Sequence, residues 1–294
     1  MITRVAGIID AHQHLWDPRL HDHPWLSKES ELNRAFYPSD LLDAVTQAPI
    51  EGTVVVQAAS STNETDWLLD LARESELILG VVGWVDLVDP MVGDRIAELA
   101  GQPLVGVRHQ VEDEPDPAWL TRPAVIRGIR AVGDSGLPFD LLVREPQRAA
   151  ALRLVARMPN QRFVIDHLAK PDVRSGEWSG WREWMAAMAS HANVSCKISG
   201  LITQADWAAW KTQSVERYIA EAIDVFGVHR CMFGSDWPVA LLAGEYGEIL
   251  ELVERSVDGL SAAERDALWR RTPLPAVLPA SRSRTCTGAR RTRQ

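Results

Sequence analysis

Residues 52–58 read Gly-Thr-Val-Val-Val-Gln-Ala, an apolar run rich in β-branched residues, without regular alternation of polar and apolar positions. Such a run is typical of a strand that is buried on both faces of a parallel sheet. Seven similar runs occur along the chain, at residues 7–12, 80–85, 104–109, 138–143, 162–167, 193–198 and 230–235. The sequence therefore predicts eight parallel strands.

Helix-length amphipathic segments separate these runs. One of them extends from Glu64 to Glu76, with Thr62 as the expected N-cap. Eight strands that alternate with helices favour a closed barrel over an open doubly wound sheet, and 294 residues suit one barrel of about 250 residues. We therefore predict an α/β protein with a single (β/α)8 TIM barrel over residues 1–272. The polar insert at residues 16–38 should overhang the mouth of this barrel.

The end of the chain has a different composition. Residues 273–294 contain three prolines and five arginines and show no apolar period. This composition predicts a disordered basic tail. An RNA-binding arm is an alternative interpretation of its charge, but a solvated extension is the simpler one.

The overall composition argues against several classes of function. With 46% hydrophobic residues the chain can bury a large core, and 31 basic against 40 acidic side chains give a net charge of −9. Proteins that bind nucleic acids or anionic membranes need an excess of Lys and Arg, which this chain lacks. Three cysteines without a C-x-x-C pair, no signal peptide and no run of about 20 apolar residues predict a cytoplasmic protein. The oligomeric state, a homo-oligomer included, is left open.

Polar residues stand where the predicted strands end, and in a parallel barrel these ends converge on one site. His12 and His14 are two residues apart, so both imidazoles project to the same side of an extended strand. His167 ends the sixth run, and Asp236 follows the eighth. Imidazoles and a carboxylate can bind a divalent metal or polarise a water, so we predict the active site here. Four further histidines are expected in solvent: His21, His23, His191 and His229.

Other residues near the strand ends are candidates for substrate binding. Arg108 and His109 end the fourth run, and since neighbouring strand residues face opposite ways, only one of them should point into the barrel. An arginine there could stabilise developing negative charge. Lys197 would be buried in the seventh run and would need a partner, for which Asp140 and Asp166 are candidates. The remaining candidates are Gln57 and three tryptophans beside strand ends, Trp16, Trp84 and Trp237.

Two common sequence signals are missing. The chain has no Gly-rich phosphate loop of the dinucleotide or P-loop kind, and no G-x-S-x-G nucleophile elbow. Ser-His-Asp catalysis therefore has no anchor in the sequence. The cysteines lie within predicted strands or in the tail, which argues against a nucleophilic cysteine.

Five stretches resemble the amidohydrolase superfamily, in its amidohydrolase-2 branch. They occur in family order and extend up to about residue 270. They are residues 9–18 (IDAHQHLWDP), 106–109 (GVRH), 163–171 (FVIDHLAKP), 197–201 (KISGL) and 233–238 (FGSDWP). The resemblance is nearest to sugar-lactone hydrolases of the L-fuconolactonase and L-rhamnonolactonase type.

The resemblance implies roles for these residues. Asp236 would be the general base that activates the hydrolytic water. The water, the lactone carbonyl or a metal would be held by three imidazoles, those of His12, His14 and His167. Arg108 or His109 would support the substrate oxygens. A positioned carboxylate can take the proton of an attacking water, and nearby donors stabilise the tetrahedral oxyanion. The expected reaction is hydrolysis of the ester bond of a small sugar-acid lactone.

The resemblance also leads to an expectation about metals. Superfamily members with two metals have a bridging lysine on the fourth strand and histidines on the fifth and sixth. Here the fourth run ends in Arg108-His109 and the fifth carries Asp140, so a two-metal centre is not expected. Lactonases of this kind are described as working without an obligatory metal, and we expect none here. The alternative is a single Zn²⁺ bound by His12, His14, His167 and Asp236.

Two other functions are left open. A metal-dependent decarboxylase of the same superfamily would need a firmly bound metal. A non-catalytic small-molecule-binding barrel is disfavoured, because a scaffold has no need of four costly polar groups at one site. Relatives usually close with a terminal helix after the last strand, whereas here Ala267-Leu268-Trp269 is soon followed by Pro273. Closure of the barrel is therefore an open point.

Overall fold

The computed structural model describes residues 7–272, and this part of the chain contains one sheet of eight strands. The strands are β1 (Ile8–Gln13), β2 (Ile50–Val56), β3 (Ile78–Gly83), β4 (Leu104–His109), β5 (Phe139–Leu141), β6 (Phe163–Ile165), β7 (Val194–Ile198) and β8 (Cys231–Phe233). Each strand pairs in parallel with the next one along the chain. Each of the eight predicted runs contains one of these strands or most of it. The predicted tail at residues 273–294 lies outside the described residues.

Backbone hydrogen bonds close the barrel between its first and last strands. The amide of Asp236 donates to the carbonyl of His12 (2.8 Å), and the amide of His14 donates to the carbonyl of Trp237 (2.7 Å). The segment after β8 thus pairs with β1 and brings Asp236 to the strand end. The predicted (β/α)8 barrel is confirmed.

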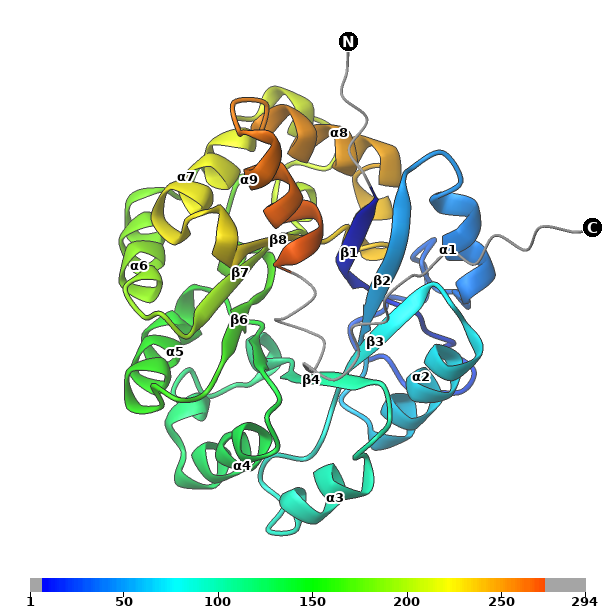
Figure 1. Ribbon diagram of the computed structural model, residues 1–294, viewed down its shortest axis with the longest axis vertical. Helices are drawn as coiled ribbons and strands as arrows, with labels where there is room; N and C mark the ends of the chain where they lie inside the picture. Colours follow the sequence, from blue (N-terminus) through cyan, green and yellow to red (C-terminus); the bar gives the residue numbers. More distant parts are fainter. Residues whose placement is uncertain (1–6, 273–294) are drawn as a thin grey trace, which may run out of the picture.

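Helices surround the barrel (Figure 1). They are α1 (Pro38–Ala44), α2 (Thr62–Glu74), α3 (Val92–Glu98), α4 (Pro123–Asp134), α5 (Glu145–Arg157), α6 (Ser179–Ala189), α7 (Glu216–Phe226), α8 (Tyr246–Ser256) and α9 (Ala262–Asp266). The main apolar core includes residues from helices α1 to α8 and from the strands. A smaller apolar cluster consists of Ala11, Val54, Val56, Val82, Val105, Val164 and Met232. Among the helices of residues 7–272, none is long and apolar enough to cross a membrane.

Helix α2 illustrates how local sequence sets a boundary. Ser61 has extended dihedral angles (φ −144°, ψ 130°), and its side chain accepts a hydrogen bond from the amide of Glu64 (3.4 Å). Ser61 is therefore the N-cap. The prediction of Thr62 as the cap was wrong by one residue, because Thr62 is already helical.

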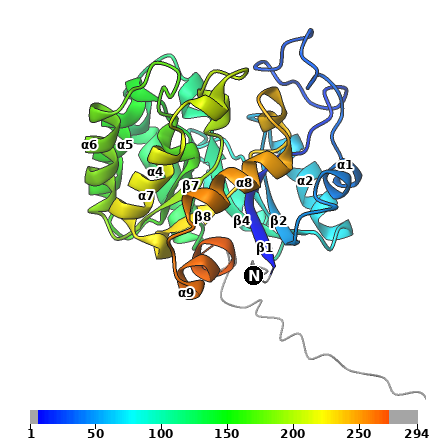
Figure 2. The ribbon, with the colours of Figure 1, turned by 90° about the horizontal axis from the view of Figure 1, so that it is seen from above.

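The described chain ends in a helical segment that packs against the barrel. Helix α9 and the following turn η8 (Ala267–Arg271) lie at the edge opposite residues 16–38 (Figure 2). Trp269 is fully buried with its ring 4.9 Å from that of Phe233, and Thr272 Oγ1 donates to the carbonyl of His229 (3.2 Å). This segment therefore covers one end of the closed barrel.

The insert at residues 16–38 rises above the carboxyl ends of the strands, as predicted (Figure 2). His23 attaches it to α2, with Nε2 2.9 Å from Glu64 Oε1 and both side chains buried. The expectation that His23 faces solvent was wrong, because its partner is 41 residues away and was not visible in the local sequence. Of the other histidines expected in solvent, one is exposed, His229, and two are partly buried, His21 and His191.

Candidate functional site

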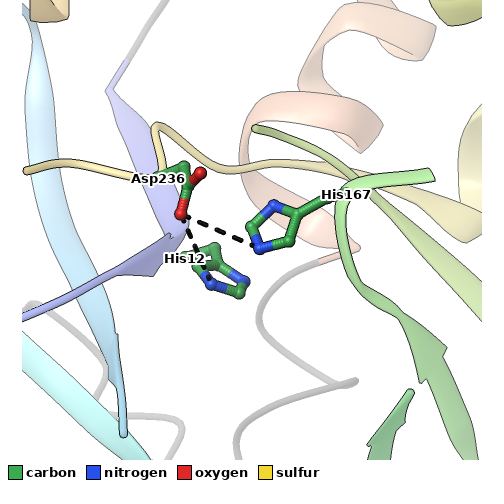
Figure 3. A group of neighbouring side chains, drawn as sticks. All are labelled: His12, His167 and Asp236. Atoms are coloured by element: carbon green, nitrogen blue, oxygen red, sulfur yellow. Dashed lines mark ion pairs between the residues drawn. The ribbon is translucent and has the colours of Figure 1, made fainter. Parts of the chain in front are cut away.

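Four side chains from three distant segments meet at the mouth of the barrel. Asp236 Oδ1 lies 3.4 Å from His14 Nε2, 3.8 Å from His167 Nε2 and 4.0 Å from His12 Nε2. Figure 3 shows the imidazoles of His12 and His167 pointing toward the Asp236 carboxylate. The sequence predicted this convergence, and the structure places all four residues together.

The other ring nitrogen of each imidazole also has a neighbour. Nδ1 of His14 donates to the carbonyl of Val56 (2.7 Å), since a carbonyl oxygen can only accept. Nδ1 of His167 lies 2.9 Å from Ser199 Oγ, and Nδ1 of His12 lies 3.2 Å from Asp166 Oδ1. These contacts orient the rings so that every Nε2 faces Asp236.

Burial sets the charge state of this group. It holds the pKa values of His12 and His167 well below the usual range for imidazole, so both rings are neutral near pH 7. Burial alone would raise the pKa of Asp236, but the neighbouring His167 and His14 outweigh it and keep that pKa below its usual value. The ionised carboxylate of Asp236 therefore faces the neutral imidazoles of His12 and His167.

This donor set fits a single divalent ion. The ligand atoms of His12, His167 and Asp236 all lie within 4.8 Å of one another, and His14 Nε2 lies 3.1 Å from His12 Nε2. Zn²⁺ binds nitrogen at about 2.0–2.1 Å in a tetrahedron, which separates two ligand atoms by roughly 3.4 Å. When Nδ1 of each ring carries the proton, the Nε2 atoms of His12 and His14 both present lone pairs to each other. Two facing lone pairs repel each other unless a cation or a proton lies near them. The residues present can therefore hold a metal.

An unusual backbone positions His167. Four consecutive residues, 167–170, have positive φ angles between 46° and 57° and form a turn of left-handed helix. Such a conformation costs roughly 1–2 kcal/mol per non-glycine residue. Arg148 of α5 donates to the carbonyls of Ala169 (3.0 Å) and Lys170 (3.2 Å), and Trp181 of α6 donates to that of Leu168 (2.7 Å). Tertiary contacts therefore hold the turn.

Two glycines leave room for the catalytic candidates. A Cβ at Gly200, whose φ is +61°, would lie 2.4 Å from His167 Nδ1 and 2.9 Å from Asp236 Oδ2. A Cβ at Gly234 would lie 2.6 Å from the Cβ of His12. A side chain at either position would displace the site.

A buried charge network lies next to the four-residue centre. Lys197 Nζ is 2.5 Å from Asp140 Oδ2 and 3.0 Å from Asp166 Oδ1, so the partners expected for this lysine are both present. Arg108 Nη1 is 3.2 Å from Asp166 Oδ2 and 3.4 Å from His12 Nε2. Burial raises the pKa of Asp140 to about 6, whereas Lys197 and His12 outweigh burial and hold the pKa of Asp166 well below its usual range.

The centre opens into a pocket of about 310 Å³, within the size range of small-ligand sites. Of the predicted catalytic residues, His14, His167, Asp236 and Arg108 line it, while His12 is fully buried. Trp25 of the insert and Trp207 contribute aromatic surface.

Seven predicted substrate-binding residues are not part of this lining: Trp16, Gln57, Trp84, His109, Asp140, Lys197 and Trp237. His109 points away from the pocket, where Trp84 donates to it (3.0 Å), Glu114 pairs with it and Trp119 stacks on it at 4.2 Å. Of the pair Arg108-His109, only the arginine faces the site, as alternation predicts.

Three of the other predicted substrate-binding residues contact residues that surround or line the pocket. The rings of Trp16 and Trp237 both pack against Phe36, and Trp16 also packs against Trp25. Gln57 accepts a hydrogen bond from Arg108 through its backbone carbonyl and so fixes the guanidinium.

Some lining residues were not predicted from the sequence. They are Ala58, Gln110, Glu112, Asp113, Leu142, Arg144, Lys170, Thr203, Gln204, Trp207, Val239 and Leu242. Most lie two to six residues beyond a strand end, so the segments that follow the predicted strands carried the signal for them. Lys170 lies within the quoted stretch 163–171, where its charge was a usable signal.

The chain resembles known proteins over most of its length. The amidohydrolase family model matches residues 9–274. L-fucono-1,5-lactonase of Burkholderia multivorans is 39% identical over 273 residues, which cover 89% of this chain and 92% of that protein. L-fucono-1,5-lactonase of Burkholderia ambifaria is 38% identical over 82% of this chain and 83% of its own.

A crystal structure of a Burkholderia multivorans amidohydrolase with bound Zn superposes with a TM-score of 0.88 at 38% identity, covering 92% of this chain and 99% of that one. The family match extends from the β1 motif to the end of the barrel. The chain belongs to the amidohydrolase family, in its amidohydrolase-2 branch.

Proposed function

We propose that this chain hydrolyses the ester bond of a sugar-acid lactone, with Asp236 as general base. The observation that carries the proposal is the ionised Asp236 carboxylate, within 4.0 Å of three imidazole nitrogens at the base of a pocket of about 310 Å³. Its similarity to L-fucono-1,5-lactonases supports an aldonolactone as the substrate class.

The reaction needs one proton acceptor that later becomes a donor. Asp236 takes a proton from water as the water oxygen attacks the lactone carbonyl carbon. The tetrahedral intermediate then expels the ring oxygen, and Asp236 returns the proton to this alkoxide. The product is the open hydroxy acid.

The developing oxyanion needs positive charge or hydrogen-bond donors. Arg108 lines the pocket, and its Nη1 lies 3.4 Å from His12 Nε2, so its charge is next to the imidazole cluster. Asp166 and the carbonyl of Gln57 hold the guanidinium in place. A fixed donor of this kind stabilises the transition state without reorganisation.

A divalent ion at His12, His14, His167 and Asp236 would, when bound, supply Lewis-acid polarisation of the carbonyl or of the water. That the enzyme needs no metal stays a prediction, as does the single Zn²⁺.

The test is a panel assay on the wild-type protein with and without chelator. Proton release is followed on aldonolactones, simple esters and an aromatic carboxylate, with CO2 release followed on the last. We expect turnover of aldonolactones with or without chelator. Folded protein that opens no lactone would contradict the proposal, and CO2 release abolished by chelator would replace it with the decarboxylase alternative.

A further inference from the structure

Three charged side chains form one wall of the pocket, and we call them the rim triad: Glu112, Arg144 and Lys170. They come from the loops that follow β4, β5 and β6, three adjacent strands. Lys170 Nζ lies 2.6 Å from Glu112 Oε1, and Arg144 Nε lies 2.8 Å from Glu112 Oε2. Arg144 Nη1 also donates to Gln204 Oε1 (3.1 Å).

The Glu112 carboxylate has free positions at which it can accept hydrogen bonds from a ligand. Its side chain is 12% exposed and that of Lys170 is 14% exposed, and both line the pocket. Burial would raise the pKa of Glu112, but Lys170 and Arg144 outweigh it and lower the pKa, so the group stays ionised. An ionised carboxylate has about four acceptor positions, and the two cations use two of them.

The pocket is balanced in charge. Its described lining carries three basic residues, Arg108, Arg144 and Lys170, and three acidic ones, Glu112, Asp113 and Asp236. Each of the three cations already has a carboxylate partner, at Asp166 or Glu112. A substrate with carboxylates of its own would have to compete with these pairs, whereas a neutral ring with hydroxyl groups would not.

Lys170 has a fixed relation to the catalytic centre. It is the last of the four positive-φ residues that begin with His167, and Arg148 holds its carbonyl. The same rigid turn therefore positions an imidazole at Asp236 and an ammonium group at the wall.

From this arrangement we infer that the rim triad recognises ring hydroxyls of a neutral polyhydroxylated lactone. Glu112 accepts hydrogen bonds from hydroxyl groups, and Lys170 donates to a hydroxyl oxygen. The inference rests on the proposed function and adds the residues that select hydroxylated rings over bare ones.

The test measures binding in an Asp236→Asn background, so that the lactone is not turned over. Calorimetry compares L-fucono-1,5-lactone with δ-valerolactone, a six-membered lactone without hydroxyl groups. We expect the added change Glu112→Gln to weaken binding of the hydroxylated lactone by about 10- to 100-fold, as for loss of a charged hydrogen bond. Binding of δ-valerolactone should change less than about 2-fold, since it makes no such bond. The matched control is Glu114→Gln, on the same loop but paired with His109 outside the pocket, and it should change neither.

The outcomes separate this inference from the proposed function. The role of Glu112 would be overturned if Glu112→Gln weakened binding of both ligands equally, or weakened binding of neither. It would also be overturned if the two ligands bound with equal affinity before the change. In the otherwise wild-type enzyme, Glu112→Gln should raise KM for the hydroxylated lactone and leave kcat nearly unchanged. If the hydroxylated lactone binds in a Glu112-dependent way but the wild type never opens it, the proposed function fails and the inference stands. If neither lactone binds, both fail.

Discussion

His12 lies in strand β1 and His14 directly follows that strand, whereas His167 reaches Asp236 from a turn of left-handed helix. In the β1 region, side chains two residues apart share a face, so the geometry is a local property of the strand. In the β6 region, four residues in a row adopt a conformation that L-residues avoid, and α5 and α6 supply the contacts that hold it.

The surroundings of His167 are more sensitive to substitution than those of β1. The side chains of a strand keep alternating between its two faces when one supporting contact is lost, because the backbone hydrogen bonds to the neighbouring strands remain. The left-handed turn depends on Arg148, Trp181 and the space left by Gly200. Changes near His167 should therefore reduce activity more than comparable changes near β1.

Among changes that compare the surroundings of His167 with those of β1, the largest effect is expected from Gly200→Ala. The new Cβ would lie 2.4 Å from His167 Nδ1, in a backbone with φ +61°, so the imidazole must move. We expect kcat/KM for lactone hydrolysis to fall by about 100-fold, because displacement of a catalytic group by about 1 Å has this cost. The control is Gly247→Ala, at a site with no atom within 4 Å of the new Cβ, and it should keep full activity. Equal rates for the two variants would show that a Cβ at position 200 does not displace the His167 imidazole.

An intermediate effect is expected from Arg148→Met. This change removes the donor to the carbonyls of Ala169 and Lys170 and leaves the Glu177 carboxylate without the cation that pairs with it. Denaturant unfolding should show a loss of about 2–3 kcal/mol, and kcat/KM should fall by about 10-fold. Arg182→Met, which breaks the exposed pair with Glu221, serves as the control and should cost no more than about 1 kcal/mol. Unchanged activity in Arg148→Met would show that the left-handed turn keeps its conformation without the Arg148 hydrogen bonds.

The smallest effect on activity is expected from Tyr246→Phe, in the β1 region. The hydroxyl donates to Asp10 Oδ2 (3.0 Å), while Asp10 also accepts from the amides of His12 and Ser235. Loss of this one bond should lower the free energy of unfolding by about 1–2 kcal/mol and change kcat/KM by less than about 2-fold. A loss of activity as large as that of Arg148→Met would remove the distinction between the two regions.

Much of the fold could be predicted because its signals are local. Eight apolar runs of the right length marked the strands, and the strand ends carried His12, His14, His167 and Asp236. Alternation also predicted correctly that only one of Arg108 and His109 faces the site.

The remainder depends on contacts between distant segments. Glu112, Arg144 and Lys170 meet only because three loops fold toward one another, and the sequence has no periodic signal for loops. The His23–Glu64 pair likewise joins residues 41 positions apart. The tryptophans beside strand ends were predicted to bind substrate, but an aromatic ring packs equally well behind a pocket wall, as Trp16 and Trp237 do.

We propose that Asp236 accepts the proton of the water that opens a lactone. The most direct measurement is the initial rate of proton release from L-fucono-1,5-lactone by wild type and by Asp236→Asn, with equal folded content confirmed by circular dichroism. We predict a fall in kcat of about 1,000-fold, within the range for loss of a general base. A variant that keeps more than about a tenth of the wild-type rate would contradict the claim, because general-base catalysis contributes at least about 100-fold.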